Sequence, residues 1–212
     1  IMFTGDIPQQ FRIGAIGSLY KKEDKMDSNN YRGIMLLSIL GKIFNYVLNK
    51  RITRYCVTEK ILSESQNGFL PFRGTIQHIF VLQEMITQML NAGETPYLFF
   101  LDLSKAFDTI NREELFSRIR KNGIPPKMLR IIKSIFKKTK ARARLSTCMS
   151  EIFETWMGVP QGDPLSPILF DLFVDPILRT LEDRTICHEV FGQKTQLMYA
   201  DDYILLTDDP EN

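Results

Sequence analysis

The stretch MYADDYILLT, residues 198–207, places two aspartates side by side between an aromatic residue and a run of β-forming residues. Adjacent carboxylates repel each other, and apolar surroundings make their charged forms costly. Neighbouring side chains of a regular strand point to opposite faces, so we expect Asp201 and Asp202 in a tight turn between two strands. Three interpretations remain open for this pair: a solvated surface turn, a strained arrangement, or a site for a divalent cation.

A third aspartate is relevant to that choice. The stretch YLFFLDLS, residues 97–104, is almost wholly apolar, which is typical of a buried central strand, and it carries Asp102 at its end. Taken alone, Asp102 fits a structural role, as a helix cap or in a turn, as well as it fits a role in binding metal. If the 198–207 hairpin abuts this strand, three carboxylates gather, and two hard cations such as Mg²⁺ would neutralise them. Such a site suits in-line phosphoryl transfer with two metals.

The remaining elements follow from hydrophobic periodicity and from helix start and stop signals. In the helix expected over 38–57, Ile39, Ile43, Val47 and Ile52 mark one face. Further helices are expected from Thr75, as the N-cap, to Gly93, and from Asn111 to Gly123, Pro125 to Phe136 and Leu165 to Leu181. Strands are expected over 141–146 and on both sides of Gly192. Strands and helices mix without strict alternation, which predicts the α+β class.

Composition excludes several kinds of protein. Hydrophobic residues make up 44% and charged residues 25% of the 212, as in an ordinary globular chain. No apolar run reaches the roughly 18 residues of a membrane span. The scattered Cys56, Cys148 and Cys187 form neither a disulfide framework nor, with the two histidines, a zinc site, so we expect inert thiols in a reducing compartment. We also expect that both ends are cut from a longer chain.

Charge is distributed unevenly. Between Arg118 and Arg144 the sequence has eleven Lys or Arg residues and no acidic residue, whereas Asp and Glu dominate after Asp175. A basic face beside an acidic pocket suits a polyanion that meets bound metal. A lysine-rich, solvated helix face explains the basic run equally well.

Four blocks in a fixed order resemble the reverse transcriptases of non-LTR (LINE-type) retrotransposons. They are LYKKEDKMDSNNYRGIMLLSILGKIFNYVLNKRI (19–52) with SESQNGFLPFRGTIQHIF (63–80), YLFFLDLSKAFDTI (97–110), GVPQGDPLSPILFDLFV (158–174) and YADD (199–202). The resemblance implies a right-hand polymerase fold with an antiparallel palm sheet backed by helices. Fingers would comprise 1–95 with 113–157, and palm 96–112 with 158–212; the thumb is not included.

The resemblance also assigns the catalytic site. It implies that Asp102, Asp201 and Asp202 bind the metals, with Asp102 and Asp201 as the more direct ligands, and that replacing Asp201 harms turnover more than replacing Asp202. Asp108, Asp171 and Asp175 are assigned to structure, at a turn and on helix surfaces.

Four further residues are implied in binding the nucleotide. Lys21 and Arg32 would hold the triphosphate, with ordinary surface charge as the alternative for Lys21 because Lys22 is adjacent. Phe107 would exclude a 2′-hydroxyl as a steric gate, or else pack in the core. Gln161 would line the nascent base pair, or belong to a simple helix-start motif. Arg73 is a further candidate, although its block departs from the family pattern at Leu70 and Phe72.

The implied function is an RNA-directed DNA polymerase that extends a primer 3′-hydroxyl with dNTPs. The implied partners are an RNA template, a DNA primer and dNTPs, with two Mg²⁺ ions (Mn²⁺ as the alternative) and neither a membrane nor a protein partner. The family setting implies nuclear work with a cytoplasmic ribonucleoprotein stage. Two alternatives remain: a decayed copy that binds RNA without catalysis, and an RNA-templated RNA polymerase, which would carry a small residue in place of Phe107.

Overall fold

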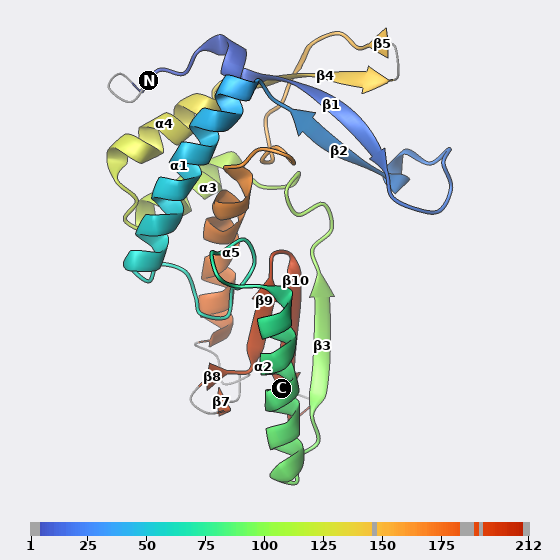
Figure 1. Cartoon of the computed structure of the whole chain (residues 1–212), viewed down its shortest axis with the longest axis vertical. Coiled ribbons are helices and arrows are strands. Elements are labelled where there is room, and N and C mark those ends of the chain that lie inside the picture. Colours follow the sequence, from blue (N-terminus) through green and yellow to red (C-terminus); the bar gives the residue numbers. More distant parts are fainter. Residues whose placement is uncertain (1–4, 146–147, 183–188, 191–192, 210–212) are drawn as a thin grey trace. The chain divides into compact units, whose positions relative to one another are not determined.

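The computed structural model describes residues 5–145, 148–182, 189–190 and 193–209. The chain forms two compact units: unit 1 is Ile1–Tyr55 with Phe107–Leu169, and unit 2 is Cys56–Ala106 with Phe170–Asn212 (Figure 1). Each unit combines helices with strands, which confirms the α+β class. The predicted fingers segment 1–95 contributes to both units, and the division into fingers and palm stays a prediction.

Unit 1 is built on a five-stranded sheet of order β2-β1-β4-β5, in which β6 also pairs with β4. β1 runs antiparallel to β2 and parallel to β4. The largest fully buried side chains on α1, α3, α4 and the start of α5 in this unit are Leu and Ile, and α3 packs on α4. The elements are η1 (Gln9–Arg12), β1 (Ile13–Tyr20), η2 (Ser28–Asn30), β2 (Tyr31–Leu36), α1 (Ile39–Thr58), α3 (Arg112–Lys121), α4 (Pro126–Phe136), β4 (Lys140–Leu145), β5 (Cys148–Met149) and β6 (Phe153–Glu154).

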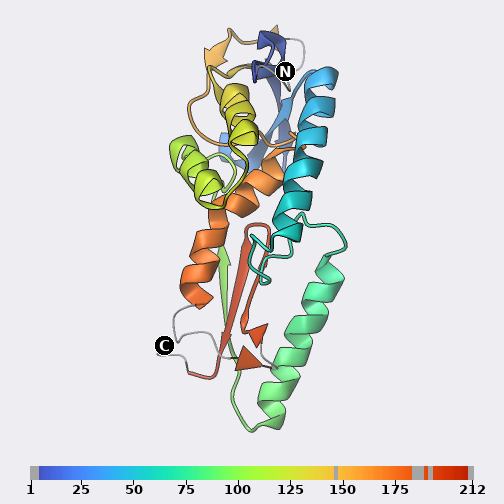
Figure 2. The ribbon, with the colours of Figure 1, turned by 90° about the vertical axis from the view of Figure 1, so that its left-hand side faces the viewer.

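Unit 2 contains a three-stranded antiparallel sheet of order β3-β10-β9. α2 covers one face, where Met85 and Met89 pack on Leu197 and Leu206, and the second half of α5 lies on the other side (Figure 2). A short β7–β8 hairpin completes the unit. Its elements are α2 (Thr75–Asn91), β3 (Tyr97–Asp102), α5 (Ser166–Glu182, shared with unit 1), β7 (Glu189–Val190), β8 (Gln193–Lys194), β9 (Gln196–Tyr199) and β10 (Asp202–Thr207).

Most of the predicted elements are confirmed. Asn111 caps α3 by accepting from the backbone N–H groups of Glu113 and Glu114, and Gly123 follows the helix with a φ of +71°. The cap of α2 is Gly74, so Thr75 is the first helical residue and not the cap. The turn predicted at Gly192 lies outside the described residues. None of the described helices is long and apolar enough to cross a bilayer.

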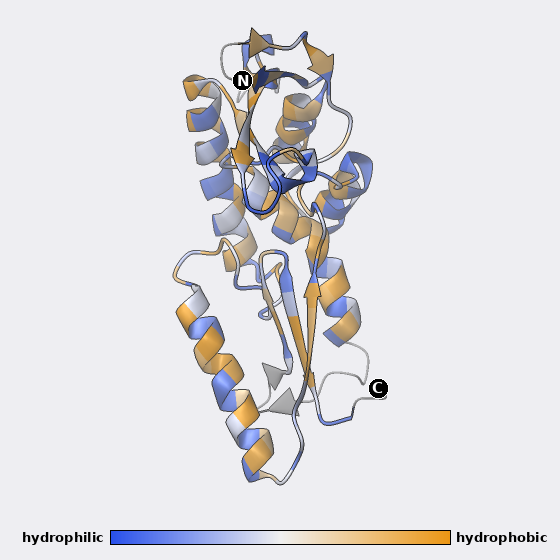
Figure 3. Ribbon diagram, turned by 90° about the vertical axis from the view of Figure 1, so that its right-hand side faces the viewer, coloured by the Kyte–Doolittle hydropathy of each residue, from blue (hydrophilic) through white to orange (hydrophobic). Residues whose placement is uncertain are grey.

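The prediction that residues 97–104 form a buried central strand is wrong. β3 pairs with β10 alone among the described strands, so it lies at an edge of the sheet, and every one of its residues is exposed. Figure 3 shows the strand as strongly hydrophobic along its length. An apolar run indicates that a strand is suited to burial, but it does not identify the element that covers it.

The face predicted for α1 is also wrong, because Ile39, Ile43 and Val47 are exposed and only Ile52 is buried. The buried line instead includes Asn45, whose side-chain amide donates to both carboxylate oxygens of Asp163, at 3.0 and 2.8 Å. Hydrophobic periodicity alone did not identify the buried face of α1, because that face includes a polar residue.

Asp171 and Asp175 on α5 are buried, at 0% and 2% exposed, which contradicts their assignment to the helix surface. Asp175 accepts from the Ser63 backbone N–H at 2.6 Å and from Arg179 at 2.8 Å. Neither oxygen of Asp171 has a hydrogen-bond partner among the described residues. Burial, with both aspartates nearby, raises the pKa of Cys56 to about 12, so this thiol stays protonated at neutral pH.

Asp171 gives a prediction about stability. Burial, with a contribution from Asp175, raises the pKa of the Asp171 carboxyl well above its ordinary value. The folded state then keeps a proton that the unfolded chain releases above about pH 4, so stability falls as pH rises from there toward the folded-state pKa. Asp171→Asn removes this loss. We expect its advantage in free energy of unfolding, measured with urea, to grow from pH 4.5 to pH 7.5.

Asp175→Asn is the matched control, because the same change there removes an ion pair with Arg179 and weakens the hydrogen bond from Ser63. It should destabilise the chain. If the free energy of unfolding changed with pH in the same way for the original chain and for Asp171→Asn, that result would contradict the burial of an unpaired carboxyl at Asp171.

Candidate active site

The predicted catalytic aspartates all lie in unit 2, where β3 and β10 bring two of them together. The antiparallel register pairs Asp102 directly with Asp202, and both side chains are exposed. Asp201 lies in the turn between β9 and β10, directly after Ala200, whose φ is +60°. The predicted tight turn is confirmed for Asp201, whereas Asp202 is already the first residue of β10.

The carboxylates of Asp102 and Asp202, which lie opposite each other on β3 and β10, are ligands of the kind that a divalent cation prefers. Like charges placed directly opposite on neighbouring strands destabilise a sheet. Within the described part of the chain, no ion pair joins any of the three aspartates to Lys, Arg or His. No group of three or more His, Cys, Asp or Glu side chains suited to hold a metal is found among those residues either. The structure thus brings two of the three carboxylates into register, and the metal site itself stays a prediction.

The turn that carries Asp201 is supported by residues 65–68. Met198 donates its backbone N–H to Ser65 at 2.8 Å, and Asn67 donates its own to Met198 at 2.8 Å. The Gln66 side chain is 1% exposed, and its Oε1 accepts from the backbone N–H groups of Gly68 at 2.8 Å and Ala200 at 3.3 Å. Gln66 thus fixes the residue that precedes the aspartate pair.

Gly68 lies close to the same turn. A Cβ atom at this position would lie 2.2 Å from the backbone nitrogen of Ala200 and 2.7 Å from its Cα. Only glycine fits this approach without moving the turn. Sequence reasoning quoted the SQNG stretch in its family block but assigned it no role, since nothing local indicates a contact more than 130 residues away.

A network of side-chain hydrogen bonds connects the β9–β10 hairpin to α5. The hydroxyl of Tyr203, the residue that follows Asp202 in β10, donates to Gln196 Oε1 at 2.8 Å. The Gln196 amide donates in turn to Glu182 at 2.9 Å and to the Leu178 carbonyl at 3.1 Å, both on α5. Glu182 also accepts from the hydroxyls of Ser63 and Ser65. The strand that bears Asp202 is therefore tied to α5 through buried polar groups.

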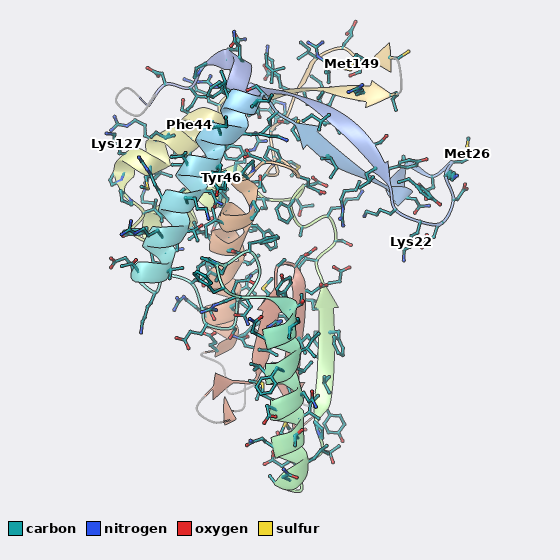
Figure 4. The ribbon with its side chains drawn as sticks, in the orientation of Figure 1. Lys22, Met26, Phe44, Tyr46, Lys127 and Met149 are labelled. Atoms are coloured by element: carbon teal, nitrogen blue, oxygen red, sulfur yellow. The ribbon has the colours of Figure 1, made fainter. Side chains whose placement is uncertain are left out.

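All four predicted nucleotide contacts lie in unit 1, and two of them share the β1–β2 hairpin. Leu19 pairs with Arg32, and the backbone N–H of Lys21 donates to Asn30 at 2.9 Å, so Lys21 and Arg32 lie at the same end of the ribbon. Both are exposed. Figure 4 shows Lys22 at this end, within the loop that joins β1 to β2, so a second lysine is available there.

Phe107 and Gln161 lie on two adjoining segments. The Val159 backbone N–H donates to the Phe107 carbonyl at 2.8 Å, and the Gln161 amide donates to Asp108 at 3.1 Å. Asp108 lies in a turn, as predicted, and it also orients Gln161. At Gly162, with a φ of +102°, a Cβ atom would lie 3.0 Å from the Met35 carbonyl oxygen, so this loop lies close against β2.

Arg112 was not identified from the sequence. Its guanidinium donates to the carbonyls of Thr155 at 2.7 Å, Met157 at 3.1 Å and Gly158 at 2.9 Å, and to two threonine hydroxyls. It therefore fixes the segment that leads into Gln161. The only sequence signal is an arginine in the first turn of a helix, where a basic residue is unfavourable for the helix dipole.

Arg73 is engaged elsewhere in unit 2. Its guanidinium donates to the carbonyls of Glu64 at 3.2 Å and Gln66 at 2.9 Å and to the Asn67 side chain at 2.9 Å. In this structure it braces the 64–67 loop, which is a sufficient role without a nucleotide.

Comparisons with known proteins identify the family and the fold of the chain. The family model "Reverse transcriptase (RNA-dependent DNA polymerase)" matches residues 20–212. The chain is 26% identical over its whole length to the Retrovirus-related Pol polyprotein from type-1 retrotransposable element R2 of Nasonia vitripennis, of which it covers 20%. It is 28% identical to the RNA-directed DNA polymerase from mobile element jockey of Drosophila funebris, over 98% of the chain and 22% of that protein. The chain thus spans about a fifth of the length of these relatives.

Solved structures of low sequence identity share the fold. A telomerase from Candida tropicalis, truncated from its C-terminal domain, matches with a TM-score of 0.66 at 15% identity, over 97% of this chain and 45% of that one. Telomerase from Candida albicans, in complex with a fragment of telomeric RNA, matches with a TM-score of 0.64 at 12% identity, over 97% and 39%. The chain belongs to the reverse transcriptase (RNA-dependent DNA polymerase) family.

Proposed function

We propose that the chain carries the polymerase site of an RNA-directed DNA polymerase, which adds dNTPs to a DNA primer on an RNA template. The observation that carries the proposal is the register of β3 and β10, which sets Asp102 opposite Asp202 next to a turn occupied by Asp201. Divalent metal use is general in this family, and we propose two Mg²⁺ ions held by the three carboxylates. Such ions would supply activation of the primer hydroxyl and stabilisation of the leaving pyrophosphate.

The other residues of the chain would bind and orient the substrates. Lys21 and Arg32, at one end of the β1–β2 ribbon, would neutralise the triphosphate and hold it in line. Gln161, oriented by Asp108, would lie against the nascent base pair. In this proposal fingers and palm follow the predicted division, and the work is nuclear with a cytoplasmic ribonucleoprotein stage. A copy without catalysis finds no support, since the aspartates and Gln161 are all retained.

The test is primer extension by the chain on an RNA template, with Mg²⁺ and after its removal by a chelator. We expect pyrophosphate release and primer extension that depend on the ion and recover when Mg²⁺ is returned. Extension that is unchanged by the chelator would contradict the two-metal site. If this chain, and also a longer chain that includes it, bound primer and template without extending the primer, the result would favour the non-catalytic alternative.

The proposed role of Phe107 gives a separate prediction. A bulky ring beneath the sugar excludes a 2′-hydroxyl by overlap, so Phe107→Ala should raise incorporation of rNTPs relative to dNTPs by roughly tenfold or more, or about 1.4 kcal/mol of discrimination. Competition between rNTPs and dNTPs in the extension assay measures the ratio. An unchanged ratio would instead assign Phe107 to packing.

A further inference from the structure

Unit 1 contains a cavity of about 690 Å³ whose lining includes none of the predicted nucleotide contacts. It lies between α3, α4 and the segment around Trp156. Five of its lining residues are basic and two, Asp6 and Glu113, are acidic. The basic residues are Arg112, Arg130, Lys133, Lys137 and Lys138.

The positive charge of this pocket exceeds the negative charge of its two carboxylates. Within the described residues, none of the five basic side chains forms an ion pair. Arg112 is 8% exposed and donates only to neutral oxygens, and burial lowers its pKa to about 10, which still leaves it charged at neutral pH. Lys133 lies 5.4 Å from the centre of the Phe116 ring and Arg112 lies 5.0 Å from that of Phe136. The pocket therefore has a net positive field.

Trp156 combines an exposed side chain with a fixed backbone. Its indole is 76% exposed. The residues on either side, Thr155 and Met157, both have their carbonyls bound by the buried Arg112, at 2.7 and 3.1 Å. A large aromatic surface held in this way loses little conformational entropy when it binds a ligand.

Positive charge beside an exposed aromatic ring is the combination that binds unpaired nucleic acid. Lys and Arg hold the phosphates, and a base stacks on the ring, whereas bases within a duplex are already stacked on each other. The cores of protein–protein interfaces are instead depleted in lysine. We propose that this pocket binds an unpaired nucleic-acid strand, with phosphates against Lys133, Lys137 and Lys138 and one base stacked on Trp156. The choice of ligand class rests on the proposed function.

Trp156 is the only tryptophan of the chain, so tryptophan fluorescence, excited selectively over that of the tyrosines, reports on this pocket alone. The chain is titrated at low salt with a twelve-residue oligouridylate, the matching oligothymidylate, duplex RNA of equal length and inorganic polyphosphate. We expect both single strands to quench Trp156 fluorescence and duplex RNA to quench it less. Polyphosphate has charges but no bases to stack, so it should not quench the fluorescence. The RNA and DNA arms show which strand is preferred.

Two pairs of variants separate stacking from charge, with anisotropy of a fluorescein-labelled oligouridylate as the readout. Trp156→Ala should weaken binding about tenfold and Trp156→Phe by less than about threefold, because a phenyl ring still stacks. Lys137→Glu/Lys138→Glu should weaken binding about tenfold and lower the slope of log affinity against log salt by about two. Arg120→Glu/Lys121→Glu, the same charge change at exposed α3 positions outside the pocket, should leave both unchanged.

Three outcomes would overturn the proposal: no quenching by either single strand, equal affinity of Trp156→Ala and Trp156→Phe, or equal effects of the two charge reversals. A Trp156 spectrum that shifts with protein concentration and not with nucleic acid would assign the surface to protein contact and also overturn it. Asp201→Asn separates the two proposals, since it should abolish extension while leaving Trp156 quenching intact. Normal extension without quenching rejects the pocket alone, and full extension by Asp201→Asn rejects the proposed site alone.

Discussion

Asp201→Asn is expected to lower primer extension by about a thousandfold or more, equivalent to roughly 4 kcal/mol of transition-state stabilisation. The amide has nearly the size of the carboxylate but lacks its charge, so it is a poor ligand for a hard cation. Because Asp201 lies in a turn and is partly exposed, the fold should persist. Single-nucleotide extension rates at saturating dNTP and Mg²⁺, with circular dichroism of both proteins, measure the effect.

Asp202→Asn tests the order of the two aspartates. The family resemblance makes Asp201 the more direct ligand, yet the strand register places Asp202 opposite Asp102. We expect Asp202→Asn to retain measurable extension, and Glu84→Gln, the same loss of charge at an exposed position of α2, to extend normally. If Asp202→Asn were as inactive as Asp201→Asn, Asp202 would be as important a metal ligand as Asp201.

The sequence predicted those parts of the fold that depend on short stretches of chain. Asn111 and Gly123 delimit α3 through contacts with their immediate neighbours, and the aspartate turn follows from alternation within ten residues. Asp171 and Asp175 on α5 were mispredicted because their burial depends on contacts outside the local sequence. A charged side chain on an apolar helix was assigned to the surface, yet Asp175 is buried because Ser63 and Arg179 bind it.

The site residues that were missed act through distant backbone. Arg112 binds carbonyls about 45 positions along the chain, and Gln66 binds Ala200 across 134 positions. No local pattern encodes these contacts, because neither a buried guanidinium nor a buried amide indicates its partner. The edge position of β3 was missed for a related reason, since an apolar strand is equally compatible with the centre or the edge of a sheet.

Gly68→Ala is expected to be the most damaging change outside the aspartates. The new Cβ would lie 2.2 Å from the backbone nitrogen of Ala200, and a backbone atom cannot rotate away as a side chain can. The turn that carries Asp201 must shift, and overpacking of this kind costs about 1–3 kcal/mol of stability. A displacement near 1 Å at a catalytic group costs about a hundredfold in rate. Extension rates and urea unfolding, both at a temperature where the variant is folded, measure the two effects.

Two further variants show whether the overlap causes the loss. Gly17→Ala in β1 is the matched control, because its added Cβ would be 4.0 Å from the nearest neighbour, and it should extend primer normally. Gln66→Ala removes the hydrogen bonds to Gly68 and Ala200 without adding any atom, so it should slow extension less than Gly68→Ala. If Gln66→Ala slowed extension more, the hydrogen bonds would position the aspartate turn more strongly than the close approach of Gly68. Unchanged extension by Gly68→Ala would show that catalysis does not depend on the position of that turn.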